Sequence, residues 1–147
     1  SERVYRKFNA GSLLDRGTLT LRQRELVIDR TCALNGCAYE WGVHIAFFAE
    51  RVGLTPSEIE ALAAPEIRDD DWPAEEAALL HLCDALHLTS RIPKDCWDRL
   101  ATHFSDEQIL ELIALAGFYR TVAYFANGLE IEPEAFGAPL PGYTPGT

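Results

Sequence analysis

The chain has 147 residues, of which 48% are hydrophobic and 24% charged, and this suits one domain with a buried core. Its 23 acidic side chains outnumber 13 basic ones, giving a formal net charge of -10. No cluster of Lys and Arg is long enough to follow a phosphate backbone, so we expect no nucleic acid partner. The most apolar stretch is interrupted by Glu111 and Arg120 and no charged-then-apolar leader is present, so we expect a soluble, cytoplasmic protein with no membrane partner.

Signals for helix starts recur along most of the sequence, whereas the alternating pattern of strands hardly appears. A capping box at residues 20–23 predicts a helix to about residue 34, and Asn35-Gly36 ends it. The next helix is expected over about residues 37–51. A Thr-Pro-Ser-Glu sequence at residues 55–58 then opens a short helix to about residue 63.

Further helix starts lie at residues 71–73, near Pro93 and at residues 105–108, so the domain is predicted to be all-α. The last helix, over about residues 106–127, is apolar around most of its circumference. Such a helix has to be covered on nearly all sides. We therefore expect it to be central in the fold and to contribute to a subunit interface.

The C-terminal residues 133–147 contain Pro, Gly and a few hydrophobic side chains without periodicity. A segment of this composition cannot bury enough apolar surface to order itself. We therefore place a single domain at residues 1–132, followed by a Pro/Gly-rich tail. The tail is expected to be mobile, or to lie across a neighbouring subunit through Phe136, Leu140 and Tyr143.

Residues 37–44 set a thiol, a carboxylate and an imidazole at helical spacing. Positions three and four apart share one face of a helix, so Cys37, Glu40 and His44 converge on one side, and Trp41 lies beside Cys37. A hairpin at Asn35-Gly36 would bring the preceding helix, with Glu25, close to this face. These groups together predict a functional site.

Two short segments, residues 24–28 and 35–44, resemble the signature of the carboxymuconolactone decarboxylase and alkylhydroperoxidase D-like superfamily. In the peroxidase branch a Glu is followed by eleven residues, a Cys, two residues, a second Cys, three residues and a His. The chain keeps this spacing from Glu25 through Cys37 to His44, but Glu40 takes the place of the second cysteine. The Tyr-Glu-Trp-x-x-His sequence instead resembles the decarboxylase branch, which tends to lack a cysteine where this chain has Cys37.

The resemblance implies an alkylhydroperoxidase D-like helical bundle that forms a homo-oligomer, as a dimer, trimer or hexamer. It also implies decarboxylase-like chemistry without a cofactor on a small carboxylated or lactone substrate. Glu25, Glu40 and His44 would then handle protons, because a carboxylate that orients an imidazole is a common general acid/base. The expected walls of the substrate pocket are Tyr39, Trp41, Phe48 and Tyr119.

Three other hypotheses about this site stay open. Cys37 could act as a thiol peroxidase, with Cys32 as a resolving thiol, because the helix N-terminus and His44 both favour a thiolate. The same pocket could bind a small ligand without catalysis. His44 could also be a structural imidazole bonded to Glu40. We expect no metal, although Glu25, Glu40 and His44 together could hold a divalent ion.

Overall fold

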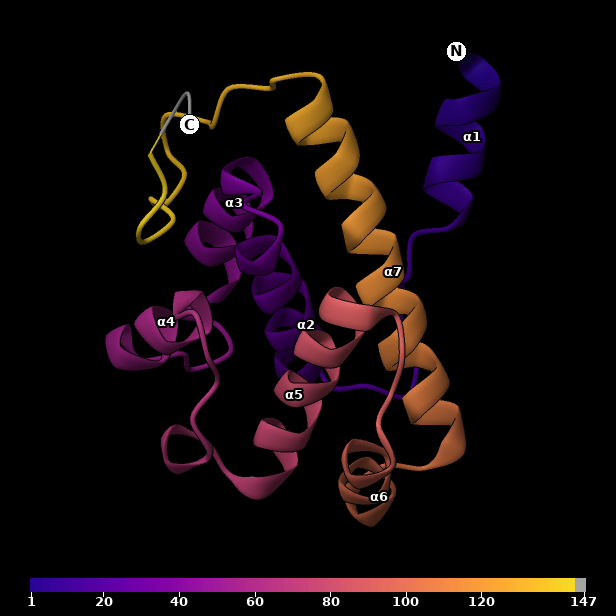
Figure 1. The fold of residues 1–147 in the computed structure, drawn as a ribbon. Coiled ribbons are helices and arrows are strands. Elements are labelled where there is room, and N and C mark those ends of the chain that lie inside the picture. The colour runs from indigo at the N-terminus through magenta and orange to yellow at the C-terminus, as the bar shows by residue number, and fades with distance from the viewer. Residues whose placement is uncertain (145–147) are drawn as a thin grey trace.

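The computed structural model describes residues 1–144, and within this range it contains helices and no strand. The prediction of an all-α bundle is confirmed (Figure 1). The α-helices are α1 (Glu2–Ala10), α2 (Leu21–Leu34), α3 (Ala38–Phe48), α4 (Pro56–Ala63), α5 (Ala74–Thr89), α6 (Lys94–His103) and α7 (Asp106–Gly128). A short 3-10 turn, Asp69–Asp71, precedes α5.

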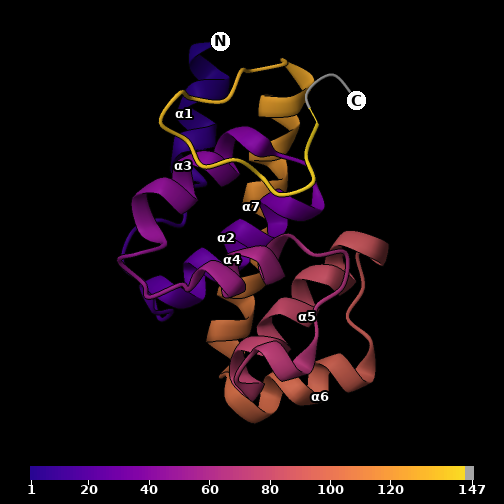
Figure 2. The same cartoon turned by 90° about the vertical axis from the view of Figure 1, so that its left-hand side faces the viewer.

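The centre of the bundle is α2, which packs against α3, α4, α5 and α7 (Figures 1 and 2). Residues 25–32 of this helix are all buried, including three charged side chains. Helix α7 lies along α2 and also packs against α3 and α6, so the two helices share the expected central position. On α7, Leu110, Tyr124 and Phe125 remain exposed, and the expected subunit contact stays a prediction.

Local capping chemistry explains where several helices begin. The capping boxes of Thr20 with Gln23 and of Thr55 with Glu58 are both formed, as is a third that opens α7. In each box a hydroxyl accepts a backbone N–H of the first turn and the partner side chain accepts the N–H of the cap residue. The predicted starts of these helices are confirmed. The predicted end of α3 is three residues late, because the helix stops at Phe48 and residues 49–53 form turns.

A buried arginine joins α2 to two other helices. The guanidinium of Arg30 forms a two-pronged ion pair with Asp84 of α5, at 2.7 and 3.1 Å. It also donates to the carbonyl oxygens of Leu62 and Ala64 at the end of α4, at 2.9 and 2.6 Å. Since Arg30 is only 1% exposed, these bonds replace the water that its charge would otherwise bind. They fix α2 relative to α4 and α5.

The N-terminal helix α1 was not among the predicted elements. None of its residues is buried, and it rests on α7 through Phe8, whose ring lies 5.0 Å from that of Phe118 and 5.5 Å from that of Phe125. The spacing of Val4, Tyr5 and Phe8 places these side chains on one helix face, which is the signal that could have revealed the helix. Because few contacts join α1 to the bundle, we expect it to be bound only weakly to α7.

The described part of the C-terminal tail lies on α3 of its own chain, so the expectation of a mobile tail is wrong, whereas contact of the tail with a neighbouring subunit stays a prediction. The Ala138 N–H donates to the Gly42 carbonyl at 3.1 Å, and the Trp41 indole N–H donates to the Pro139 carbonyl at 3.2 Å. Leu140 is buried. Phe136 and Tyr143 are largely exposed. The tail therefore completes the core above Trp41.

Replacing Gly42 by alanine is expected to detach this tail. A Cβ at Gly42 would lie 2.9 Å from the Ala138 carbonyl oxygen and 3.3 Å from Gly137 Cα, both of them backbone atoms. We expect a loss of about 1–3 kcal/mol in the free energy of unfolding, with faster proteolysis between residues 130 and 140. Thermal unfolding and limited proteolysis with mass analysis test this.

The matched control is Gly117→Ala on α7. A Cβ there meets nothing within 4 Å, so the better helix propensity of alanine should raise stability by about 0.5–1 kcal/mol. If Gly42→Ala instead left both stability and proteolysis at the parental level, the tail would not be held on α3 as described.

Helix α7 also satisfies the length and composition of a membrane span, with a mean hydropathy of 1.4 over its most apolar window. A core helix of a globular domain passes the same test. Here Leu112, Leu115 and Tyr119 of α7 are buried against the rest of the bundle. The finding is therefore weak evidence for a membrane.

Candidate active site

The α2–α3 hairpin brings Glu25 and His44 into direct contact. The turn is made by Asn35 and by Gly36, whose φ of +60° is accessible to glycine without strain. His44 Nδ1 lies 3.0 and 3.1 Å from the two carboxylate oxygens of Glu25. Both side chains are buried, with 6% of His44 and 2% of Glu25 exposed. The pairing expected from the hairpin is present.

The other side of the His44 ring faces α3 and α7. His44 Nε2 lies 3.2 Å from the Tyr119 hydroxyl and 3.4 Å from Glu40 Oε2. Phe48 stacks on the imidazole with a centroid distance of 5.4 Å and an angle of 25°. These contacts hold the ring so that one nitrogen faces Glu25 and the other faces Glu40.

The surroundings of His44 favour its charged form. Burial lowers the pKa of this imidazole, but the hydrogen bonds to Glu25 and then to Glu40 outweigh burial and raise the pKa to about 10. Near neutral pH both ring nitrogens therefore carry hydrogen, and the ring donates to a carboxylate on each side. Tyr119 accepts from Nε2 as well. Burial, followed by the charge of Glu40, raises the pKa of the Tyr119 hydroxyl and keeps it neutral.

Asp29 is a further buried carboxyl, one helical turn after Glu25. Burial, followed by the charge of Glu25, raises its pKa well above the ordinary value, and its Oδ1 has no hydrogen-bond partner among residues 1–144. Asp29 is thus a buried carboxyl that lies beside Glu25 and His44 and binds its proton more tightly than an exposed aspartate does. One ligand atom from each of these three residues lies within 4.8 Å of the others, so Asp29, rather than Glu40, completes the group that could hold a cation.

Cys37 occupies the N-cap position of α3 and is completely buried. A hydrogen bond from the Cys32 thiol lowers the pKa of Cys37. Burial opposes this shift, and the backbone N–H of Glu40 adds to it. The pKa of Cys32 is raised well above the ordinary thiol value, first by its bond to Cys37 and then by burial. The structure therefore places the two cysteines side by side, with Cys37 as the more acidic thiol.

An apolar cavity of about 390 Å³ opens beside Glu40, between α1, α3 and α7. Helix α1 covers it with Val4, Tyr5 and Phe8. No Lys or Arg is among the described residues that line it. The lining residues are Ser1, Val4, Tyr5, Phe8, Tyr39, Glu40, Val122, Phe125, Ala126, Leu129 and Ile131. Glu40 thus has the cavity on one side and His44 on the other.

Of the four residues expected to form the wall of the substrate pocket, only one lines the cavity. Tyr39 does line the cavity, and its hydroxyl donates to Glu134 at 3.2 Å. Trp41 is a core residue that is fully buried under the tail. Phe48 and Tyr119 contact His44 instead of the cavity. The residues of α1 and α7 that form most of the wall were missed, because their proximity to α3 depends on tertiary packing.

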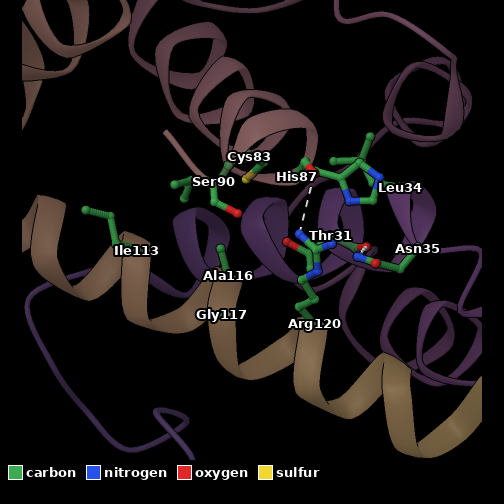
Figure 3. A pocket seen from close by; sticks show the side chains of 11 residues that line it. Thr31, Leu34, Asn35, Cys83, His87, Ser90, Ile113, Ala116, Gly117 and Arg120 are labelled. Atoms are coloured by element: carbon green, nitrogen blue, oxygen red, sulfur yellow. Dashed lines mark hydrogen bonds between the residues drawn. The ribbon is translucent and has the colours of Figure 1, made fainter. Parts of the chain in front are cut away.

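A second cavity of about 200 Å³ lies on another side of α2, between α5 and α7 (Figure 3). In this view Arg120 of α7 reaches towards α5, and its guanidinium donates to the His87 carbonyl oxygen at 3.4 Å. His87 Nδ1 is buried without a partner among the described residues. None of Glu25, Cys37, Glu40 and His44 lines this cavity.

The all-α bundle, with the buried Glu25–His44–Glu40 contact between α2 and α3, is that of an alkylhydroperoxidase D-like helical protein. The sequence profile of the carboxymuconolactone decarboxylase family matches residues 2–82. The chain therefore belongs to the carboxymuconolactone decarboxylase family. It is 30% identical over 111 residues to the uncharacterized protein YdfG of Bacillus subtilis (strain 168), covering 74% of this chain and 71% of YdfG.

Three solved structures share the fold. The first, from Agrobacterium tumefaciens, is a protein of unknown function for which a role as the antioxidant defence protein AhpD has been suggested; its TM-score is 0.82 at 24% identity, over 92% of this chain and 93% of that chain. An uncharacterized peroxidase-related protein from Silicibacter sp. TM1040 has a TM-score of 0.76 at 20% identity, over 92% of this chain and 72% of that chain. An uncharacterized peroxidase-related protein from Ralstonia eutropha JMP134, with an alkylhydroperoxidase AhpD core, has a TM-score of 0.74 at 22% identity, over 90% of this chain and 70% of that chain.

Proposed function

We propose that the protein is a cofactor-independent acid/base catalyst that moves a proton on a small, apolar carbonyl compound such as a lactone. The observation that carries this proposal is the position of Glu40, which lies between an apolar cavity and the charged pair of His44 and Glu25. A carboxylate at the edge of an apolar space is well suited to exchange protons with a bound molecule.

Glu40 is the group that touches the substrate in this proposal. It takes a proton from a carbon next to the carbonyl group and returns it to another position of the same molecule. His44, charged because Glu25 and Glu40 raise its pKa to about 10, donates a hydrogen bond to Glu40 and orients the carboxylate. Glu25 holds the other imidazole nitrogen, 3.0 Å away, and is a positioning residue.

The charge of the cavity narrows the substrate class. Glu40 is an acidic group in its wall, and none of the described lining residues is Lys or Arg. A carboxylated substrate would place a second negative charge near Glu40 without a cation to balance it. The cavity therefore favours the uncharged lactone over the carboxylated substrate within the class expected from the sequence.

Proton exchange with solvent tests the proposal without knowledge of the product. Small lactones and enolisable ketones are incubated with the protein in heavy water, and NMR follows the loss of hydrogen next to the carbonyl group. We expect exchange above the uncatalysed rate for at least one compound. Glu40→Gln keeps the shape of the side chain but removes the base, so it should slow exchange by about 10²–10⁴-fold.

The matched control is Glu60→Gln, because Glu60 is an exposed glutamate on α4 that does not line the cavity. Its exchange rate should equal that of the parent. If Glu40→Gln exchanged as fast as the parent, Glu40 would not be the base. Binding of these compounds without any exchange would support a non-catalytic ligand-binding protein instead.

A second candidate function is thiol peroxidase activity through Cys37. The specific observation in its favour is the lowered pKa of Cys37, whose neighbours Cys32 and Glu40 donate hydrogen bonds to it through a thiol and a backbone N–H. A thiolate is the form of cysteine that attacks a peroxide. This candidate requires a second thiol to complete the reaction, because Glu40 stands where the peroxidase motif has one.

A further inference from the structure

We infer that Cys32 and Cys37 form a reversible disulfide, so that α2 supplies the second thiol that residue 40 does not. The pair would be a two-electron redox site for small hydroperoxides. This inference deepens the second candidate function and does not depend on the acid/base proposal. Its readout is a covalent bond, so it can succeed or fail whatever the result of the exchange experiment.

The backbone holds the two cysteines at a distance that a disulfide can bridge. Cys32 lies in the last turn of α2, Cys37 is the N-cap of α3, and the Cys37 N–H donates to the Cys32 carbonyl oxygen at 2.9 Å. Adding the N–Cα bond and the Cα-to-oxygen span of a peptide to this bond limits the Cα–Cα separation to about 6.8 Å. Disulfides span about 4.4–6.8 Å between Cα atoms.

The two thiols also differ in acidity, as a peroxidase reaction with an attacking and a resolving thiol requires. The Cys32 thiol donates a hydrogen bond to the Cys37 sulfur, so the two sulfur atoms face each other. Cys37 is the nucleophile because it ionises more readily, while Cys32 keeps its hydrogen until a partner accepts it. By contrast, burial raises the pKa of Cys83 to about 12, and Cys83 lies on α5. Cys96 lies on α6, further from this hairpin in the chain.

The chemistry balances with one hydroperoxide. The Cys37 thiolate attacks one peroxide oxygen, the O–O bond breaks, and the leaving group takes a proton, so that hydroxide from hydrogen peroxide becomes water and alkoxide from an alkyl hydroperoxide becomes an alcohol. Cys37 is then a sulfenic acid. Cys32 attacks its sulfur, the S–O bond breaks, and water leaves with the Cys32 proton. Two thiols are oxidised to a disulfide and one peroxide is reduced. An external dithiol returns the pair to its starting state.

The oxidant has to be small, because neither sulfur is exposed. Both Cys32 and Cys37 have 0% of their surface accessible. Hydrogen peroxide is close to water in size, so it can enter during brief openings of the N-terminal turn of α3 that would still exclude a bulky hydroperoxide. A preference for hydrogen peroxide over cumene hydroperoxide is therefore part of the inference.

Peptide mapping tests the bond directly. The reduced protein is treated with hydrogen peroxide, denatured, alkylated and digested with trypsin, which releases residues 31–51 as one peptide that contains both cysteines. We expect this peptide to carry no alkyl group and to be two hydrogen atoms lighter than the same peptide with two free thiols. Two of the four thiols of the chain should then remain titratable, and dithiothreitol should restore all four.

Two variants separate the roles of the cysteines. Cys32→Ser keeps a hydrogen-bond donor beside Cys37 but removes the second thiol, so it should stop the reaction at a sulfenic acid on Cys37 that dimedone traps, with no disulfide. Cys83→Ser changes another buried cysteine and should leave the disulfide between residues 32 and 37 intact. Circular dichroism confirms that each variant is folded. The inference is overturned if both cysteines of peptide 31–51 stay alkylated in the treated parent, or if Cys37 pairs with Cys83 or Cys96.

Discussion

Replacing Asp84 by alanine is expected to lower the free energy of unfolding by about 3–5 kcal/mol. The change removes the carboxylate that pairs with Arg30 at 2.7 Å and leaves the guanidinium, which is 1% exposed, without its counterion. A buried charge without a partner is strongly destabilising. Urea unfolding followed by far-UV circular dichroism measures the difference.

The control uses an ion pair on the surface with the same distance between nitrogen and oxygen. Lys94 Nζ lies 2.7 Å from Asp98 Oδ2, but both side chains are mostly exposed. Asp98→Ala should therefore change stability by less than about 1 kcal/mol. Equal losses for Asp84→Ala and Asp98→Ala would show that the Arg30 pair does not hold α2 to α5 as we describe.

Stability is expected to fall as the pH rises from about 6.5 towards 10. His44 has an ordinary pKa of 6.5, and in the folded protein its pKa is raised to about 10. A group with a raised pKa binds its proton more tightly when folded. Its contribution is complete below pH 6.5 and disappears as the pH passes through about 10. At about 1.4 kcal/mol for each pKa unit, the loss is on the order of several kcal/mol.

Comparison with His44→Asn isolates this contribution, because Cys37 has a lowered pKa and shifts stability in the opposite direction as its thiol ionises. Asparagine can still donate a hydrogen bond but does not ionise in this range. Chemical unfolding between pH 6 and pH 10 should show the advantage of the parent over the variant shrinking as the pH rises. A constant advantage over this interval would contradict a charged His44 in the folded protein.

Local signals in the sequence were sufficient for most helices and for the central contact of the site. Thr20, Thr55 and Ser105 mark their helices through bonds to residues three positions away, so no knowledge of distant packing is needed. The short Asn35-Gly36 turn keeps the two helices next to each other and favours a hairpin, and that hairpin brings Glu25 to His44.

The parts that escaped prediction depend on contacts between distant segments. Phe8 meets Phe118 and Phe125, more than a hundred residues away, and these contacts give the cavity its cover. The tail carries no periodic pattern, yet a glycine at position 42 leaves room for Ala138 to reach α3. Cys32 was considered as a resolving thiol from the sequence, but its contact with Cys37 could not be predicted, because helix periodicity does not tell which way two helix ends face.

The continuous burial of residues 25–32 makes one short stretch of α2 responsible for unrelated tasks. Arg30 ties α2 to α4 and α5, while Glu25, Asp29 and Cys32 share the face of α2 that meets His44 and Cys37 on α3. A saturation mutagenesis experiment would find few neutral substitutions there. Activity and expression level would also fall together, so a variant in this stretch can be assigned a catalytic defect only after its folded fraction has been measured.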